Sequence, residues 1–162
     1  YAIFGIDVQS QLDAFWGLSG ESAAYEVVMQ TLERTAKTPL SIPFWDAFID
    51  YYGKSPLYTA VGAYDAVNGL VDAIEAADSL DNDDIIAELE SWDKSNPHQG
   101  VGGNAAWWPD SHDLVAGYPY GHTMWVQWQT DGTKVVIPTS IYPDALSTGD
   151  FMLPPWVETA WA

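Results

Sequence analysis

The sequence contains no cysteine, and it has five Lys and Arg residues against 23 Asp and Glu, which gives a formal net charge of -18 at pH 7. A chain without cysteine forms neither disulfides nor cysteine-ligated zinc or iron–sulfur sites. So few cations cannot replace the counterions around phosphates, which excludes nucleic acid, and on the same grounds an anionic membrane surface, as a partner. No apolar run approaches the roughly 20 residues of a membrane span.

Motifs for cofactors and covalent chemistry are also missing. Neither a GxGxxG nor a P-loop pattern occurs, and no serine lies in a nucleophile elbow. The three histidines, His98, His112 and His122, lack the i, i+4 pairing of a helical zinc site. The sequence therefore predicts no cofactor, no metal and no enzymatic activity.

What is present is enough apolar material for one domain. Of the 162 residues 48% are hydrophobic and 14% aromatic, and a chain of this length buries roughly 70% of the surface it exposes when unfolded. The acidic excess favours two interpretations equally: a halophilic or otherwise salt-adapted source, or simply an acidic protein.

The first 35 residues have an α/β pattern. The apolar run from Ala2 to Ile6 is typical of a buried strand. Because domains seldom begin with a buried strand, we expect the chain to be the later part of a longer polypeptide. Asp7 follows this strand, at the end where open α/β sheets place ligand-binding groups. Residues 9–18 are expected to be helical, and 25–32 fit either a strand or a helix.

Helix signals dominate the middle of the chain. Ser41 before Pro43 predicts an N-cap with proline in the first turn, and Gly53 predicts the end of that helix. From Ser55 to about Ala77 the spacing of apolar residues predicts a long core helix. That apolar stripe consists of Leu57, Ala60, Val61, Tyr64, Val67, Val71 and Ile74. Asp81 or Asn82 is expected to cap a further, shorter helix.

The last third is richer in Gly, Trp and Pro. After a loop over residues 100–113, the alternation from Met124 to Gln129 predicts a strand, and Asp131-Gly132 predicts a two-residue turn. A returning strand is expected over 134–137. The proline-punctuated tail is expected to run irregularly over the surface, with Trp156 as an apolar anchor.

Four stretches together resemble the C-terminal half of type I periplasmic binding proteins, in the branched-chain amino acid group that serves ABC transporters. These stretches are FGIDVQSQ with the downstream SGESAAYE, the helix pair SPLYTAVGAYDAVNGLVDAIEAADSLDNDDIIAELE, the loop GVGGNAAWWPDSHD, and the hairpin MWVQWQTDGTKVVIP. The resemblance covers nearly all of this chain. It implies an α/β fold of two Rossmann-like lobes, of which this chain is the C-terminal half.

The resemblance also implies a division of the chain between the lobes. Residues 1–35 are expected in the second lobe, 36–117 in a segment that returns to the first lobe, 118–140 in a second-lobe hairpin, and 141–162 in an irregular tail. The implied partners are the N-terminal half of the same protein, an ABC permease and a small amino acid-like ligand. The implied location is extracytoplasmic: periplasmic, anchored to the cell surface, or secreted.

Three ligand-binding residues follow from the resemblance. Asp7 matches the carboxylate that binds the ligand ammonium, a charge-assisted hydrogen bond worth about 1.5 to 3 kcal/mol, but it fits equally well as the cap of the next helix. Tyr58 and Thr59 match a first-lobe contact to the ligand side chain, although Tyr58 also suits a purely structural role at a helix start. Tyr64 lies on the apolar stripe and is expected in the core.

Two alternative functions stay open. One is an extracellular structural or surface-assembly protein that reuses the fold. The other is a secreted carbohydrate-binding protein, for which Trp107 and Trp108 beside Asp110, His112 and Asp113 are the candidate residues. Against the second, a Pro-Asp-Ser-His-Asp sequence is typical of a solvated turn.

Overall fold

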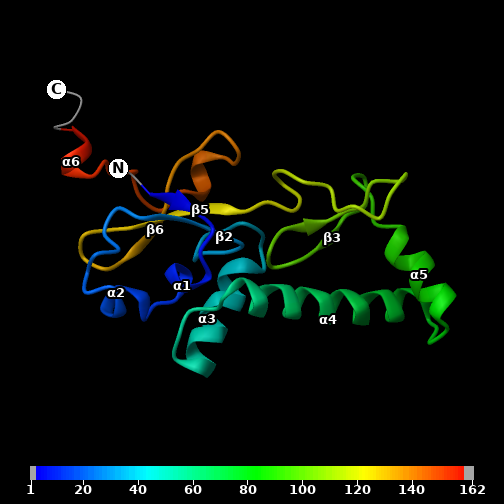
Figure 1. The fold of residues 1–162 in the computed structure, drawn as a ribbon. Coiled ribbons are helices and arrows are strands. Elements are labelled where there is room, and N and C mark those ends of the chain that lie inside the picture. Colours follow the sequence, from blue (N-terminus) through cyan, green and yellow to red (C-terminus); the bar gives the residue numbers. More distant parts are fainter. Residues whose placement is uncertain (1–2, 159–162) are drawn as a thin grey trace.

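The protein is described here by a computed structural model of residues 3–158, which is elongated and has a sheet at one end and helices at the other (Figure 1). In chain order its elements are β1 (Phe4–Gly5), α1 (Val8–Gln11), α2 (Phe15–Leu18), β2 (Val27–Gln30), α3 (Ser41–Tyr52), α4 (Tyr58–Ala77), α5 (Asn82–Glu90), β3 (His98–Gln99), β4 (Asn104–Ala105), β5 (Met124–Trp128), β6 (Lys134–Val136), a 3-10 turn (Asp144–Leu146) and α6 (Pro155–Glu158). We call residues 3–30 and 124–158 the sheet region and residues 41–117 the helical region. The chain crosses between them at 31–40 and 118–123.

The sheet region is built on four strands in the order β1-β2-β5-β6. β1 pairs parallel with β2, and the pairings of β2 with β5 and of β5 with β6 are antiparallel. Of residues 25–32, which fitted two structures by sequence, Val27–Gln30 form the strand β2. The hairpin around Asp131-Gly132 is confirmed, but its loop is longer than the predicted two residues, because the Gln129 N–H donates to the Thr133 carbonyl at 2.8 Å. One core cluster lies on this sheet: Val28, Met124, Val126, Val136, Tyr142 and Leu146.

Two members of that core come from the tail, which the sequence predicted to be irregular surface. Tyr142 donates its hydroxyl to the Ile137 carbonyl at 2.7 Å and is buried, and Leu146 is buried in the 3-10 turn. Trp156, the expected anchor, is 53% exposed but meets Tyr25 edge-on with ring centroids 5.4 Å apart. The tail therefore closes the core with residues that the sequence analysis did not select.

Three local predictions among residues 3–53 are wrong. The run expected as a buried strand forms the two-residue strand β1, and Ile3, Phe4 and Ile6 are 63%, 53% and 71% exposed. The helix expected over 9–18 is two short helices, because Leu12 has an extended backbone (φ -72°, ψ 137°) that ends α1. Ser41 is not an N-cap: it is the first residue of α3, and its hydroxyl donates to the Val101 carbonyl instead. Gly53 does end α3, in the left-handed conformation (φ 67°) that favours glycine.

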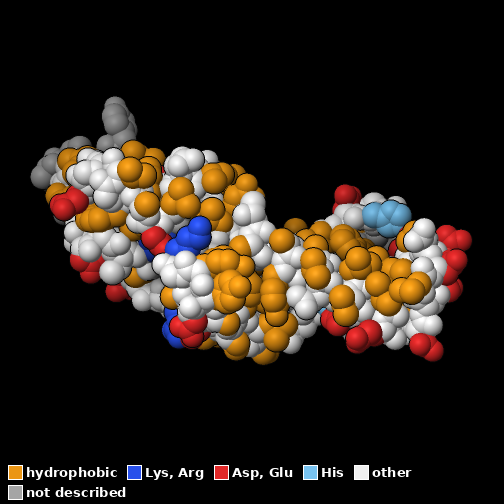
Figure 2. All heavy atoms as spheres, turned by 90° about the horizontal axis from the view of Figure 1, so that it is seen from below, with side chains coloured by type: hydrophobic (Ala, Val, Ile, Leu, Met, Phe, Trp, Pro, Cys, Tyr) orange, Lys and Arg blue, Asp and Glu red, His pale blue; other side chains and the backbone are white. Residues whose placement is uncertain are grey.

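The long helix α4 is close to its predicted bounds, and Asp81 caps α5 as one of the two predicted candidates, accepting from the Asp83 N–H. The prediction of a core helix is wrong for this chain, however. Of the predicted apolar stripe Val61 is buried, whereas Val67 is 63% exposed. Hydrophobic side chains consequently gather on the surface over α3 and α4 (Figure 2). Within residues 3–158, no helix is long and apolar enough to cross a membrane.

Candidate functional site

Asp7 lies two residues after the end of β1 and caps α1. Its carboxylate accepts the backbone N–H groups of Gln9 at 3.2 Å and Ser10 at 3.0 Å. The side chain is nevertheless exposed, and a carboxylate has about four lone-pair sites. Capping is therefore established in the structure and leaves acceptor capacity for a ligand, so the two roles are compatible.

Tyr58 and Thr59 are the first two residues of α4, as expected. Both are exposed, Tyr58 by 42%. The helix begins after Leu57, which has an extended backbone and no side-chain cap. Neither residue, nor Asp7, lines any of the three cavities described below. The structure thus presents the three predicted site residues at an open surface rather than in a closed pocket.

Tyr64 is not a core residue in this chain. Its side chain is 46% exposed, and its ring lies 4.8 Å from that of Phe44 in α3. Phe44 continues an aromatic row along α3 to Phe48 and Tyr52. Tyr64 therefore helps to join α3 to α4 through aromatic contacts, with the rest of its surface uncovered.

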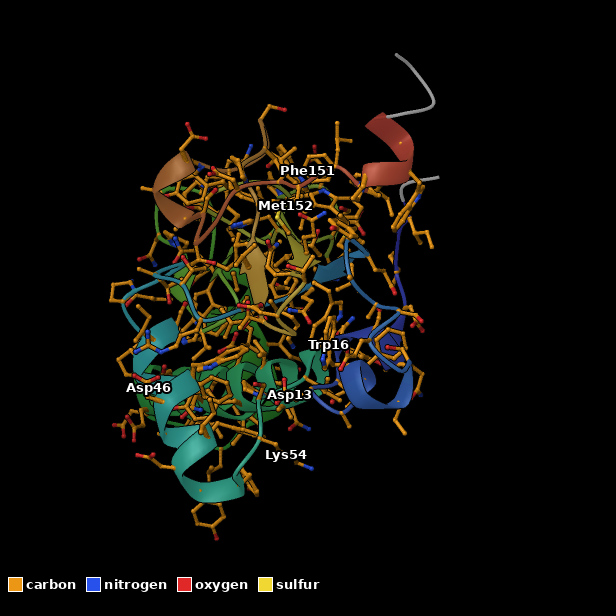
Figure 3. All side chains as sticks on the ribbon, turned by 90° about the vertical axis from the view of Figure 1, so that its left-hand side faces the viewer. Asp13, Trp16, Asp46, Lys54, Phe151 and Met152 are labelled. Atoms are coloured by element: carbon orange, nitrogen blue, oxygen red, sulfur yellow. The ribbon has the colours of Figure 1, made fainter. Side chains whose placement is uncertain are left out.

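A polar cluster joins the sheet region to the helical region. The Ser55 N–H, three residues before α4, donates to Asp13 at 2.9 Å. Asp13 belongs to the turn that joins α1 to α2, and its side chain is labelled in Figure 3. Lys134 of β6 reaches the same carboxylate at 3.3 Å and donates to the Gln11 carbonyl at 2.8 Å. This contact connects the segment before Tyr58 with the segment after Asp7.

The cluster continues inward to Glu33. This carboxylate is buried, lies 3.7 Å from Lys134 and accepts from Gln30 at 2.9 Å. Burial raises the pKa of Glu33, against the lowering effects of Lys134 and of the hydrogen bonds from Arg34 and Gln30. Burial acts the same way on Asp13, but the hydrogen bond from Ser55 and the charge of Lys134 outweigh it, so the pKa of Asp13 is lowered. These groups line a cavity of about 300 Å³ with Trp45 and Trp128.

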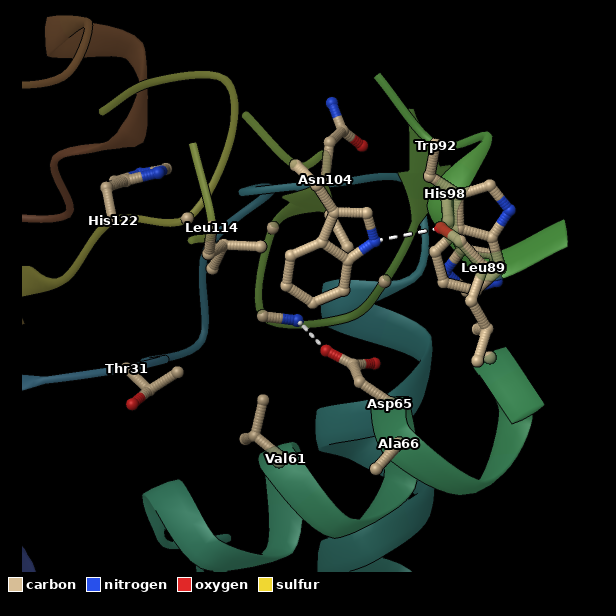
Figure 4. A pocket seen from close by; sticks show the side chains of 18 of the residues that line it. Thr31, Val61, Asp65, Ala66, Leu89, Trp92, His98, Asn104, Leu114 and His122 are labelled. Carbon is tan, nitrogen blue, oxygen red and sulfur yellow. Dashed lines mark hydrogen bonds between the residues drawn. The ribbon is translucent and has the colours of Figure 1, made fainter. Parts of the chain in front are cut away.

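A larger cavity of about 660 Å³ lies between α4, α5 and the β3–β4 loop (Figure 4). Its walls are mainly apolar, with Val61, Leu89, Trp92, Trp107 and Leu114 among them. Trp107 is fixed there by donating its indole N–H to the Leu89 carbonyl at 2.9 Å. Trp92 stacks on His98, whose ring bonds to Asp72 at 2.8 Å.

Asp65 holds the floor of this cavity in place. Its two carboxylate oxygens accept the N–H groups of Val101 at 2.6 Å and Gly102 at 2.8 Å, as Figure 4 shows in part. At Gly102 a Cβ atom would lie 2.9 Å from Val61 and 3.2 Å from Asp65. Glycine is therefore required here for the loop to approach α4.

Lys37 connects the two crossings of the chain. Its ammonium donates to the Thr31 carbonyl at 2.8 Å and to the His122 carbonyl. Burial lowers the pKa of Lys37 to about 8, although Asp65 opposes this. Burial also lowers the pKa of His122, and its Nε2 atom is buried without a hydrogen-bond partner among residues 3–158.

Of the candidate carbohydrate residues, Trp107, Trp108 and Asp110 line one cavity of about 440 Å³, whereas His112 and Asp113 do not line it. Trp107 lines the apolar cavity, and Lys94 lies 3.6 Å over the ring of Trp108. His112 bonds to Glu90 at 2.8 Å, and Asp113 accepts from Ser111. The Pro-Asp-Ser-His-Asp sequence is thus an exposed turn in which Ser111 and Asp113 hydrogen-bond to each other, as the sequence indicated.

No protein-family model and no curated protein matches the sequence. Solved structures do. A leucine binding protein, LivK, from Thermotoga maritima is 22% identical with a TM-score of 0.61, and the match covers 83% of this chain and 35% of that one. A putative branched-chain amino acid ABC transporter protein from Rhodospirillum rubrum is 20% identical with a TM-score of 0.57, over 76% of this chain and 34% of that one.

A periplasmic binding protein type 1 from Bordetella pertussis is 20% identical with a TM-score of 0.52, over 71% of this chain and 33% of that one. This chain has the type I periplasmic-binding-protein fold. It spans about a third of the length of these neighbours. The type I fold and the partial coverage agree with the resemblance identified from the sequence.

Proposed function

We propose that this chain is the C-terminal half of a substrate-binding protein of an ABC importer, which acts outside the cytoplasmic membrane and catalyses no reaction. The observation that carries this proposal is the fold, because its solved neighbours are solute-binding proteins of such transporters. One of them, from Rhodopseudomonas palustris, is in complex with 3,4-dihydroxybenzoic acid. The fold therefore supports a small-molecule ligand without specifying which one.

The proposed ligand is a branched-chain amino acid or a similar small amino acid or amide. An ammonium group that leaves water needs an ionised acceptor. Asp7 supplies one at the carboxyl end of β1, where α/β folds place binding groups. Tyr58 and Thr59 would contact the rest of the ligand from the start of α4.

The two sides of this site belong to different lobes in the proposal. Residues 1–35 and 118–140 would form part of the second lobe, and 36–117 would return to the first. The Asp13–Ser55 hydrogen bond then joins the lobes beside the site. Hinge closure around the ligand would present the closed form to the permease subunits. The N-terminal half of the protein would complete the first lobe.

The test is a titration of the complete gene product with leucine, isoleucine, valine and small amides, followed by tryptophan fluorescence. Asp7→Asn keeps an oxygen that can cap α1 but removes the charge, whereas Asp7→Ala removes both. The matched control is Asp81→Asn, which makes the same change at the cap of α5.

We expect saturable binding that weakens about tenfold or more in Asp7→Asn, the scale of a lost charge-assisted bond. Asp81→Asn should bind as the wild type does. Equal affinity of Asp7→Asn and the wild type would reduce Asp7 to a helix cap. A folded wild-type protein that responds to none of these compounds would refute the proposed ligand class.

A further inference from the structure

The two crossings between the sheet region and the helical region, residues 31–40 and 118–123, leave the sheet from neighbouring strands. The antiparallel pairing of β2 with β5 ends at Gln30 and Met124, the residues next to the two crossings. Beyond this pair, no backbone hydrogen bond joins 31–40 to 118–123 within the described part of the chain. The backbone itself therefore does not hold the two crossings together.

One side chain makes this link instead. Lys37 lies in the first crossing, and its ammonium donates to the Thr31 carbonyl of that crossing at 2.8 Å and to the His122 carbonyl of the second. Thr31 and His122, both labelled in Figure 4, lie one and two residues beyond the last strand pair. The ammonium thus joins the crossings at the point where the strand pairing stops.

The burial of Lys37 indicates that these two bonds account for the residue type. Lys37 is only 5% exposed, and a lysine is seldom buried so fully unless its charge is paired. Burial lowers its pKa to about 8, although the charge of Asp65 on α4 opposes this. A hydrophobic side chain of similar volume would fill the same space without the cost of burying a charge. What such a side chain lacks is the ability to join two carbonyl groups.

The second crossing is arranged to accept this bond. His122 Nδ1 lies 2.8 Å from the Tyr120 carbonyl, and because a carbonyl only accepts, Nδ1 carries the proton. Burial and the charge of Lys37 lower the pKa of His122, against the effect of the Tyr120 bond. The imidazole is therefore neutral at pH 7 and does not repel the ammonium that its own backbone carbonyl binds.

We propose that Lys37 is a positioning residue for lobe closure, because it joins both crossings through one ammonium and makes them rotate as a single hinge. Hinges are a few residues between domains that absorb the change in backbone angles, and two unlinked crossings would absorb it independently. Lys37 touches no ligand and acts only through the crossings. The inference rests on the proposed two-lobed division, but not on the identity of the ligand.

The experiment measures the distance between the two regions in the complete gene product. The 162 residues contain no cysteine, so spin labels are attached to Leu18→Cys in α2 and Leu80→Cys after α4, with any cysteine elsewhere replaced by serine. Leu18 and Leu80 are 78% and 82% exposed. Pulsed electron paramagnetic resonance gives the distribution of label separations in this background and in Lys37→Met, without ligand. The matched control, Tyr142→Phe, removes a buried hydroxyl that donates to the Ile137 carbonyl inside the sheet region.

We expect Lys37→Met to broaden the distance distribution or to add a second distance, and Tyr142→Phe to leave it unchanged even where it lowers the melting temperature. The Gly121 amide, in the second crossing, should exchange about tenfold faster or more in Lys37→Met, the scale of one lost charge-assisted bond. An unchanged distribution in Lys37→Met would overturn the inference. Equal broadening in both variants would also overturn it, because the effect would then reflect lost stability alone. Since no ligand is added, the result is independent of the ligand titration.

A pH series on the labelled protein gives the same test without a substitution at Lys37. As the pH rises through about 8, Lys37 loses its proton, and the charged or titratable groups that face it are the carboxylate of Asp65 and the already neutral imidazole of His122. A neutral amine makes weaker hydrogen bonds than an ammonium, so the distribution should broaden with a midpoint near this pH. A distribution that stays constant through this range, or that broadens equally in Lys37→Met, would contradict the proposal.

Discussion

Removing the carboxylate of Asp65 is predicted to release the loop that forms the floor of the larger cavity. Its two oxygens accept the N–H groups of Val101 and Gly102 at 2.6 and 2.8 Å. Each charge-assisted bond is worth about 1.5 to 3 kcal/mol, but the two share one carboxylate and are not additive. We therefore expect Asp65→Ala to cost about 3 kcal/mol of unfolding free energy, and Asp65→Asn, which keeps one acceptor, to cost about half as much.

The assay is hydrogen exchange at the amides of Val101 and Gly102 in the complete gene product, beside denaturant unfolding. A loss of about 3 kcal/mol corresponds to exchange roughly 100-fold faster at these amides. Asp72→Ala is the control, because Asp72 also lies on α4 but its hydrogen bond to His98 is made by a 58% exposed side chain. It should cost less than about 1 kcal/mol. Equal effects of the two alanine variants would refute the reasoning.

Three further perturbations have defined outcomes. Burial lowers the pKa of Lys37 from 10.5 to about 8. Between these pH values the unfolded chain binds more protons than the folded one, so the free energy of unfolding should rise with pH. In Lys37→Met this rise should be absent. The pKa of Asp13 is lowered from 3.8, so Asp13 adds to the free energy of unfolding above that pH, and this addition is lost as the pH falls below it. Asp13→Ala should speed hydrogen exchange of the Ser55 amide and remove this acid dependence of stability. Gly132 has φ 81°, and a Cβ there would lie 2.8 Å from Trp16; Gly132→Ala should lower the melting temperature, with a cost of about 1 to 3 kcal/mol, and an unchanged melting point would contradict it.

Sequence patterns of a few residues predicted the helix ends and the hairpin that depend on neighbouring residues alone. Asp81 caps α5, Gly53 ends α3, and the Asp131-Gly132 turn joins β5 to β6. Each depends on a residue type that satisfies backbone groups or adopts a left-handed conformation within a few positions. Such requirements can be recognised in the sequence without knowledge of the tertiary structure.

Such local signals did not predict the contacts between segments that are distant in the sequence. Lys134 meets Asp13 and Glu33 across more than a hundred residues, and no sequence spacing marks that cluster. Ser41 was predicted as a cap because Pro43 follows it, but its hydroxyl bonds to Val101 in a distant loop. Tertiary hydrogen bonds took priority over the local capping pattern.

The sequence predicted at which ends of the helices and strands the candidate site residues lie, but not which residues surround them. Asp7 lies at the end of β1, and Tyr58 at the start of α4, as the sequence indicated. The apolar stripe of α4 predicted the helix but not its burial, because Val67 and Val71 are 63% and 45% exposed.

The most direct test of the account is a calorimetric titration of the complete gene product with leucine, isoleucine and valine. A two-lobed substrate-binding protein should bind at least one of them saturably at a single site per molecule, with a negative heat-capacity change as apolar surface is buried. Because the heat of binding changes with temperature, the titration is repeated at a second temperature. A folded protein that gives no binding heat with any of the three amino acids at either temperature would contradict the central claim.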